Sequence, residues 1–197
     1  MPKLIAERIV APAMMAEQSV RVRCHEASLE QLLSELAVHR LDIVLSDQPV
    51  PDGLNLKAYN HRLGESSMSF FALRNQARRY RSSFPESLAD APMLLPSPNS
   101  ALRRRLDDWF EAHAIFPRIV GEFDDSALLK AFGEAGAGIF AGPTVIADEI
   151  CRMYRMAVIG ETDEIKERFY AISPERRLRH SSVVLITDTA RADLFTS

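Results

Sequence analysis

The sequence has little cysteine, no long apolar run and no excess of positive charge, and each lack excludes a class of protein. Its two cysteines, Cys24 and Cys151, lie in segments that read as a strand and a helix, so we expect buried, reduced thiols rather than a disulfide. Neither has the spacing of metal ligands, and we expect no bound metal or cofactor. No stretch approaches the roughly 18 apolar residues of a membrane span, and the start lacks the pattern of a secretory signal, which favours a cytoplasmic protein without a membrane partner.

A net charge of −3 argues against a stand-alone nucleic-acid binder, because such proteins usually carry a basic face. The three arginines at 103–105 are followed by Asp107, Asp108 and Glu111, which indicates a solvated helix face. The other basic cluster is ERRLRH at 175–180, and we interpret it as a surface loop rather than a phosphate-binding group.

Catalytic motifs are also missing, because the sequence contains neither a GxSxG nucleophile elbow nor an HExxH zinc motif. A histidine adjoins a cysteine at 24–25 and a serine at 180–181, but neighbours on an extended chain point to opposite faces. The adjacent aspartates at 107–108 and 124–125 do not converge as an acid and a base must. We therefore expect no catalytic residues and no enzyme.

Helical and strand-like segments do alternate along the chain, which predicts an α/β fold. One helix is expected over 29–37, where Ser28 and Gln31 form a capping box, and others after Asn99 or Ser100 and over 145–154, just after Pro143. Short apolar runs bounded by turn residues predict the strands, at 20–24, 42–46, 55–60, 68–73, 93–97, 118–123, 137–142, 156–160 and 168–173. The first of these alternates most cleanly and is expected at a sheet edge.

Two stretches interrupt this alternation, the polar segment 74–92 and the charged segment 160–167. Each adjoins a strand rather than dividing the chain at its middle. We therefore expect a second domain inserted into the first, with two crossings between them.

Three glycines, Gly133, Gly136 and Gly138, follow the helical run SALLKAF and lead into IFAGP. Phosphate-binding loops place their glycines before a helix, where free N–H groups face the anion. Glycine at a helix C-terminus instead allows a left-handed cap, and the helix dipole there repels anions. The spacing favours a helix exit over a phosphate site.

The ends of the predicted strands carry most of the candidate ligand-binding residues. In open α/β sheets a ligand binds beyond the carboxyl ends of strands, where helix N-termini converge. Four such corners hold the candidate residues, which are Ser46 and Asp47, then Ser97, Asn99 and Ser100, then Asp124 and Asp125, and finally Gly142. Taken singly, Ser, Asp and Asn are also the preferred N-caps of helices. Taken together, the corners would form a pocket with a few polar groups, as small-molecule sites require.

Several strings resemble a known family, and they run from about residue 30 to about residue 180. They are EQLLSELAVHRLDIVLSDQPVP, KAYNHRLGES, SFFA, SALRRRLDDWFE, VGEFDDSALLKAFGEAGAGIF and ERFYAISPERRLRH. The chain resembles the effector-binding region of LysR-type transcriptional regulators, and within them the activators of sodium/proton antiporter genes.

This resemblance implies a periplasmic-binding-protein-like fold of two α/β subdomains joined by two crossover strands. The first subdomain would be residues 1–72 with 169–197, and the second 73–168. An effector would bind in the cleft between them, with Ser46 and Asp47 from the first subdomain and the other corner residues from the second.

The resemblance also implies partners. The effector is expected to be sodium or another alkali cation held by oxygen ligands, or a small organic molecule held by helix N-termini. The family associates through antiparallel pairing, so a homodimer or tetramer is expected. A solute-binding protein of a transport system shares the fold and is the alternative function.

Full-length relatives begin with a winged helix-turn-helix domain and a linker helix, which this chain lacks, so DNA binding is expected only through that absent domain. The family also has a strand directly before the helix that matches PKLIAERIV. Because a missing central strand would leave its neighbours' backbone groups unpaired, at about 1–3 kcal/mol for each buried group, we expect a longer gene product.

Overall fold

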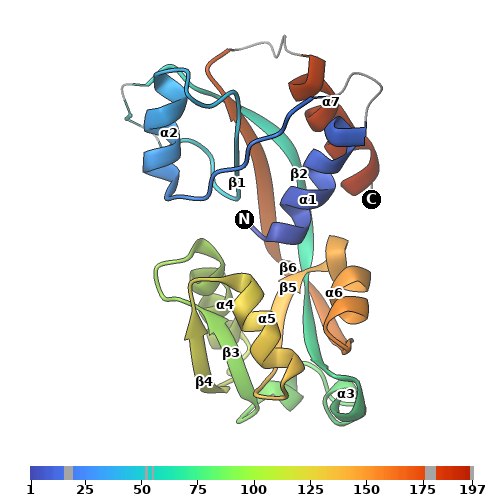
Figure 1. The fold of residues 1–197 in the computed structure, drawn as a ribbon. Helices are drawn as coiled ribbons and strands as arrows, with labels where there is room; N and C mark the ends of the chain where they lie inside the picture. The colour runs from blue at the N-terminus through green and yellow to red at the C-terminus, as the bar shows by residue number, and fades with distance from the viewer. Residues whose placement is uncertain (16–19, 52, 55, 176–180, 196–197) are drawn as a thin grey trace. The chain divides into compact units, whose positions relative to one another are not determined.

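The protein is described by a computed structural model that covers residues 1–15, 20–51, 53–54, 56–175 and 181–195. The chain divides into two compact units. Unit 1 consists of Met1, Lys3–Glu65 and Arg168–Ser197, and unit 2 of Pro2 and Ser66–Glu167. Two long strands, β2 (Tyr59–Leu73) and β6 (Met156–Ser173), run from one unit into the other and are neighbours in one sheet (Figure 1). Among the described helices, none is both long and apolar enough to cross a membrane.

The described residues of unit 1 form three α-helices, a short strand, and the parts of β2 and β6 that belong to this unit. Helix α1 (Lys3–Met15) packs against α7 (Ser181–Thr189), and a π-helical turn, Ala190–Leu194, follows α7. Helix α2 (Leu29–Ala37) begins at the Ser28–Gln31 capping box, which confirms that prediction. Its buried Leu33 and Leu36 pack against Val44 and Ile172. Strand β1 (Val44–Ser46) pairs antiparallel with β6.

Unit 2 contains a parallel pair of strands, β3 (Pro92–Pro96) and β4 (Arg118–Phe123). A third strand, β5 (Phe140–Pro143), pairs antiparallel with β2, and Ile139 just before it forms a parallel bridge to Met93 of β3. The connecting elements are α3 (Arg74–Arg81), the 3-10 turn Glu86–Leu88, α4 (Ala101–Ala112), α5 (Ser126–Glu134), the 3-10 turn Thr144–Ile146 and α6 (Ala147–Met153).

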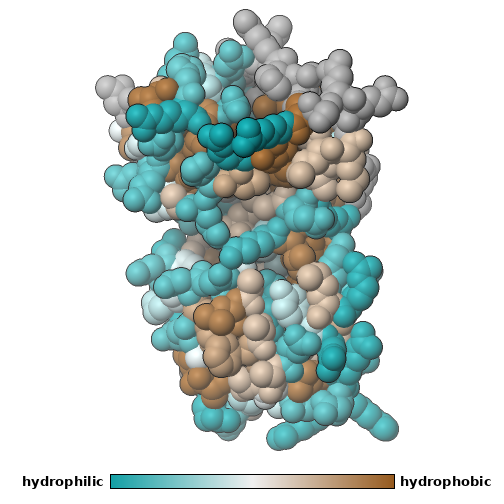
Figure 2. All heavy atoms as spheres, in the orientation of Figure 1, coloured by the Kyte–Doolittle hydropathy of each residue, from teal (hydrophilic) through white to brown (hydrophobic). Residues whose placement is uncertain are grey.

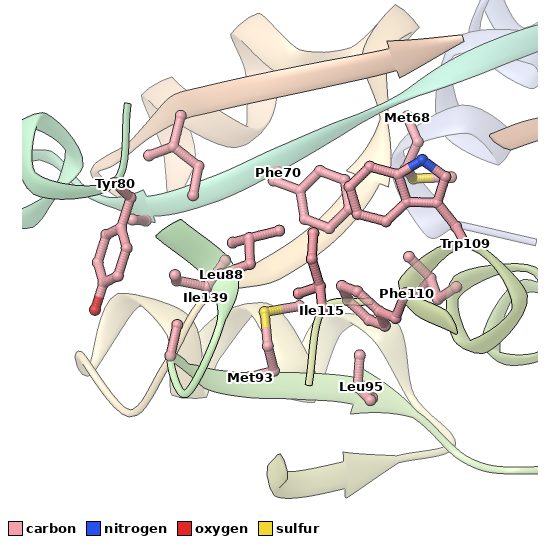
Figure 3. Close-up of a cluster of buried hydrophobic side chains, with 14 of the residues drawn as sticks. Met68, Phe70, Tyr80, Leu88, Met93, Leu95, Trp109, Phe110, Ile115 and Ile139 are labelled. Carbon is pink, nitrogen blue, oxygen red and sulfur yellow. The ribbon is translucent and has the colours of Figure 1, made fainter. Parts of the chain in front are cut away.

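Aromatic side chains pack together within the largely aliphatic core of unit 2 (Figure 3). The ring of Phe70, from β2, lies with its centroid 5.2 Å from the centroid of Trp109 and 6.3 Å from that of Phe110. The ring centroid of Phe84 lies 6.2 Å from that of Trp109 and 5.4 Å from that of Phe70. Because aromatic residues bury about 150–250 Å² each, this cluster joins β2, α4 and the segment after α3 into one core.

The predicted helix exit is confirmed for Gly136, whereas Gly133 lies buried inside α5 and Gly138 lies in the segment that leads into β5. Gly136 has φ +85°, the left-handed conformation that ends a helix. A Cβ atom on Gly138 would lie only 2.7 Å from the carbonyl oxygen of Pro92. Glycine is therefore required at 138 because the backbones of the β5 segment and β3 approach closely there.

Arg103 contradicts the interpretation of 103–105 as a solvated face, because only 9% of it is exposed. Its Nε donates to both carboxylate oxygens of Asp107 at 2.9 Å, and its Nη1 donates to the carbonyl oxygen of Pro96 at 3.1 Å and to the carboxylate of Glu122. Burial disfavours the charged guanidinium, but the hydrogen bonds to Glu122 and Asp107 outweigh it and raise the pKa of Arg103. The side chain thus ties α4 to β3 and β4.

The predicted strand at 20–24 is wrong, because these residues have no regular secondary structure. An alternating pattern makes a strand only where a neighbour supplies backbone hydrogen bonds, and no ladder is recorded for this part of the described chain. Cys24 is consequently exposed rather than buried. Cys151 is half-buried, and burial raises the pKa of its thiol. Both cysteines are free, as expected.

The two stretches that interrupt the predicted alternation themselves contain regular secondary structure. The charged segment 160–167 lies inside β6, where Ile165 and Glu167 are buried between exposed charged residues, so it reads as an amphipathic strand. The polar segment 74–92 begins with helix α3, whose arginines hid its helical pattern. Of the predicted strand 55–60, only residues 59–60 are in a strand, and residues 56–58 have no regular secondary structure. Residues 59–60 and the predicted strand 68–73 belong to the single strand β2. Residues 176–180 of the basic cluster lie outside the described residues.

We predict that Gly138→Ala lowers the free energy of unfolding by about 1–3 kcal/mol, because a methyl group would collide with the Pro92 carbonyl. Urea unfolding followed by circular dichroism measures the change. Ala137→Ser, at the exposed neighbouring position, serves as control and should change stability by less than about 0.5 kcal/mol. An unchanged midpoint for Gly138→Ala would contradict the close approach.

We also predict that Arg103→Ala lowers the free energy of unfolding by about 2 kcal/mol, because charge-assisted hydrogen bonds to Asp107 and Glu122 are lost. The matched control is Arg104→Ala, an exposed neighbour on the same helix. Equal effects of the two substitutions in the same unfolding experiment would show that Arg103 does not connect the elements.

Candidate functional site

The carboxyl ends of β3 and β4 meet at one edge of unit 2. Pro96, the last residue of β3, is paired with Phe123, the last residue of β4. The backbone N–H of Ser97 then donates to the carbonyl oxygen of Phe123 at 2.9 Å. The first residues after the two strands, Ser97 and Asp124, are therefore brought close together, as the position of ligands in α/β sheets requires.

Helix α4 begins at this edge. Ser100 is its N-cap, and the Ser100 Oγ accepts from the backbone N–H of Arg103 at 3.0 Å. A tight turn precedes it, because the N–H of Ser100 donates to the carbonyl oxygen of Ser97 at 3.0 Å. Asn99, within this turn, is exposed. The expectation that Asn99 or Ser100 begins the helix is confirmed for Ser100.

Helix α5 begins beside it. Asp125 is its N-cap, and the Asp125 Oδ1 accepts from the N–H groups of Ala127 at 2.6 Å and Leu128 at 3.4 Å. Asp124 is exposed, one residue before the cap. Two helix N-termini, with their partial positive charge, thus lie at one edge together with hydroxyl, amide and carboxylate groups. This set can hydrogen-bond a small polar ligand.

Gly142 lies inside β5 opposite Ser69 of β2, and not at the corner after the strand. It is buried, and a Cβ there would contact Ile150 at 3.3 Å and Phe71 at 3.4 Å. The corner itself is formed by Pro143, which begins the 3-10 turn before α6. Gly142 therefore acts in packing in unit 2.

Polar side chains of β2 meet that corner, and the sequence analysis did not single them out. The Ser69 Oγ donates to Thr144 Oγ1 at 2.8 Å, and the Ser66 Oγ accepts from the N–H of Val145 at 3.1 Å. Ser69 is fully buried and also lies 3.3 Å from Glu161 Oε1. The available signal was a serine within the apolar run MSFFAL, because a buried hydroxyl needs a hydrogen-bond partner.

In unit 1, Ser46 ends β1 and Asp47 follows it. Ser46 is buried, and its Oγ accepts from the N–H of Gln48 at 3.0 Å, which is a local turn contact. The Asp47 carboxylate lies 3.5 Å from the amine of Met1. These local contacts are a sufficient structural reason for Ser46 and Asp47. Their role in ligand binding stays a prediction.

A second polar contact in unit 1 joins β2 to β6. His61 Nε2 lies 3.0 Å from Ser173 Oγ. Burial lowers the pKa of His61, which the backbone carbonyl of Glu175 partly offsets, so the imidazole is mainly neutral at neutral pH. A neutral ring that exchanges a hydrogen bond with a serine has a structural role between the strands.

Metal ligands do not gather in the described part of the chain, where no group of three or more His, Cys, Asp or Glu residues is arranged to hold a metal ion. The candidate residues at the four corners include three carboxylates, which are Asp47 in unit 1 and Asp124 and Asp125 in unit 2. The described edge of unit 2 thus offers mixed polar groups rather than a carboxylate cage.

Known proteins share both sequence and structure with this chain. Residues 4–194 match the LysR substrate binding domain family. The transcriptional activator protein NhaR of Escherichia coli (strain K12) is 32% identical over 193 residues, which is 98% of this chain and 63% of NhaR. The chain therefore spans less than two thirds of the length of this curated relative.

Solved structures agree on the fold. The regulatory domain of HypT from Salmonella typhimurium has a TM-score of 0.70 at 19% identity, covering 94% of this chain and 91% of that one. The effector binding domain of QuiR, in complex with shikimate, has a TM-score of 0.67 at 16% identity, covering 97% and 92%. Fold and family are as the sequence predicts: the chain belongs to the LysR family of transcriptional regulators, a family of regulators rather than enzymes, and has the periplasmic-binding-protein-like α/β fold of their regulatory domains.

Proposed function

We propose that this chain is the effector-sensing part of a cytoplasmic, NhaR-like transcriptional activator, and that a small polar ligand or ion controls it. DNA binding would be supplied by a segment outside this chain. The observation that carries the proposal is the edge of unit 2, where Ser97 and Asp124 follow paired strand ends and α4 and α5 begin.

The groups at this edge favour a small polar molecule over a bare cation. Serine hydroxyls, the amide of Asn99 and helix N-termini donate hydrogen bonds, which suits an oxygen-rich ligand. QuiR, a relative in fold, is in complex with shikimate, which supports the same class of ligand here.

A sodium ion is the second candidate, because the sequence resembles activators of sodium/proton antiporter genes and because Asp124 and Asp125 lie at this edge. Hard cations take oxygen ligands, and these carboxylates are exposed. Asp47 and Ser46 of unit 1 stay predicted contributors to either ligand.

We predict that the backbone amide NMR signals of Ser97, Asn99, Ser100 and residues 124–126 shift saturably with one of two probes. In the first titration, sodium chloride replaces potassium chloride at constant ionic strength. In the second, potassium shikimate is added while the potassium concentration is held constant. Asn99→Ala should weaken shikimate binding about fivefold, by loss of one hydrogen bond, and Asp124→Asn should weaken sodium binding more than shikimate binding.

Asp108→Asn, an exposed aspartate further along α4, is the matched control and should leave both titrations unchanged. Shifts distributed evenly over the acidic surface would contradict a site at this edge. The proposed site would also be contradicted if these amide signals were the same in sodium and in potassium and did not respond to shikimate.

We further propose that the chain forms a homodimer through the β4–α5 face of unit 2. This face is apolar and exposed, and Figure 2 shows hydrophobic side chains over this part of the molecule. Its exposed residues, on β4, the segment before it and α5, are Phe116, Ile119, Val120, Leu128 and Phe132. Because β4 is an edge strand with exposed apolar side chains, it would be prone to aggregate unless covered. A second copy of the chain covers it and agrees with the antiparallel association of the family.

We predict that the double substitution Val120→Glu and Phe132→Glu converts a dimer into a monomer, because two buried charges would oppose association. Gel filtration with light scattering at tens of micromolar measures the mass. Val38→Glu changes an exposed apolar residue of unit 1 and should leave the dimer intact. A natural chain that is monomeric under these conditions contradicts the proposal.

A further inference from the structure

One end of unit 2 carries a group of six exposed arginines, the arginine cluster. Its members lie on α3, at the end of α6 and in the turn to β6, and are Arg74, Arg78, Arg79, Arg81, Arg152 and Arg155. Figure 2 shows hydrophilic side chains projecting from the end of unit 2 where Figure 1 places α3. Helix α3 has four arginines among its eight residues and no acidic residue, in a chain whose net charge is −3.

Two members of the cluster fix α3 in place. Arg74 Nη2 donates to the carbonyl oxygen of Cys151 at 3.2 Å, and the N–H of Arg74 donates to the carbonyl oxygen of Arg155 at 3.4 Å. Arg81 Nε donates to the carbonyl oxygen of Val158 at 3.1 Å. These bonds place α3 along the end of α6 and the start of β6, so the arginines of both segments share one surface.

The remaining charge is largely uncompensated. Within the described residues, no ion pair is recorded for Arg78, Arg79 or Arg152, and Arg155 alone in the cluster meets a carboxylate, Glu134, at 3.7 Å. The Arg79 guanidinium lies 5.5 Å from the centroid of the Tyr80 ring, which holds the side chain. Like charges three or four residues apart destabilise a helix, so this composition works against the stability of α3.

We propose that the arginine cluster is a docking surface for an acidic segment of a partner protein. Arginine is suited to carboxylates because its planar guanidinium donates two parallel hydrogen bonds to both oxygens of one group. Residues three or four positions apart on a helix such as α3 have Cβ atoms about 5–6 Å apart. Successive acidic side chains of one segment can therefore each pair with a different arginine of the cluster.

The surroundings favour an acidic segment over DNA. Carboxylates border the cluster, with Asp148 and Glu149 in the first turn of α6, Glu134 beside Arg155, and Glu86 in the turn that packs on α3. A duplex carries about one phosphate charge per 1.7 Å and would set phosphates against these carboxylates as well. A segment of a few acidic residues covers the arginines alone.

The test measures binding of a short fluorescein-labelled oligoglutamate peptide to the whole 197-residue chain by fluorescence anisotropy at low ionic strength. Replacing Arg78, Arg79 and Arg152 together by Gln should weaken binding about tenfold, since each lost exposed pair contributes modestly. Gln is a good helix former, and circular dichroism verifies that α3 and the fold are retained. The charge-matched control replaces Arg21, Arg23 and Arg40 of unit 1 by Gln.

Unchanged binding by the control variant, together with the loss in the cluster variant, supports the docking surface. Equal weakening by both variants would show that only net charge matters and would overturn it. Failure of the natural chain to bind the peptide would also overturn it, and so would tighter binding of a duplex DNA that the cluster substitutions abolish. None of these results depends on whether an effector binds at the ends of β3 and β4.

Discussion

Parallel hydrogen bonding between β3 and β4 is the constraint on which the candidate site depends. The two strands end in register at Pro96 and Phe123, and the next backbone N–H, that of Ser97, continues the pairing. Parallel strands must be connected by a crossover, so α4 returns the chain from one to the other and begins at the shared edge. Arg103 in the first turn of α4 is bound to Pro96, Glu122 and Asp107, and it keeps that beginning against the strands.

The ligand-binding role that we propose for this edge of unit 2 is compatible with the structural role of its residues. Ser100 and Asp125 each satisfy N–H groups of the helix that they begin, which is a sufficient structural reason for their presence. Ser97, Asn99 and Asp124 do not cap a helix, and they are the groups that we propose to contact a ligand. A site of this kind costs the fold little, because the turns that the strands require already place polar residues where a ligand can reach them.

Elements with a local chemical signature could be predicted from the sequence, and those that depend on distant pairing could not. The Ser28–Gln31 box, the Ser100 cap, strand 118–123 and the glycine helix exit are each encoded within a few residues. The segment 20–24 has an ideal alternating pattern, yet a strand requires a neighbour that a local pattern does not reveal. The burial of Arg103 was not predicted, because the sequence shows its charge but does not show that the Pro96 carbonyl of β3 and the Glu122 carboxylate of β4 accept its hydrogen bonds. For the candidate site, the strand ends located Ser97 and Asp124, whereas Ser66 and Ser69 lie inside β2 and carry no sign of their partners.

The aromatic core of unit 2 has a consequence for optical work on this protein. Trp109 is the sole tryptophan of the sequence, and it is buried among Phe70, Phe84 and His113, with its ring centroid 4.5 Å from that of the histidine. Tryptophan emission therefore originates from unit 2 alone. Tryptophan fluorescence follows the environment of α4 and β2 in unit 2 and does not report directly on the packing of α1 on α7 in unit 1.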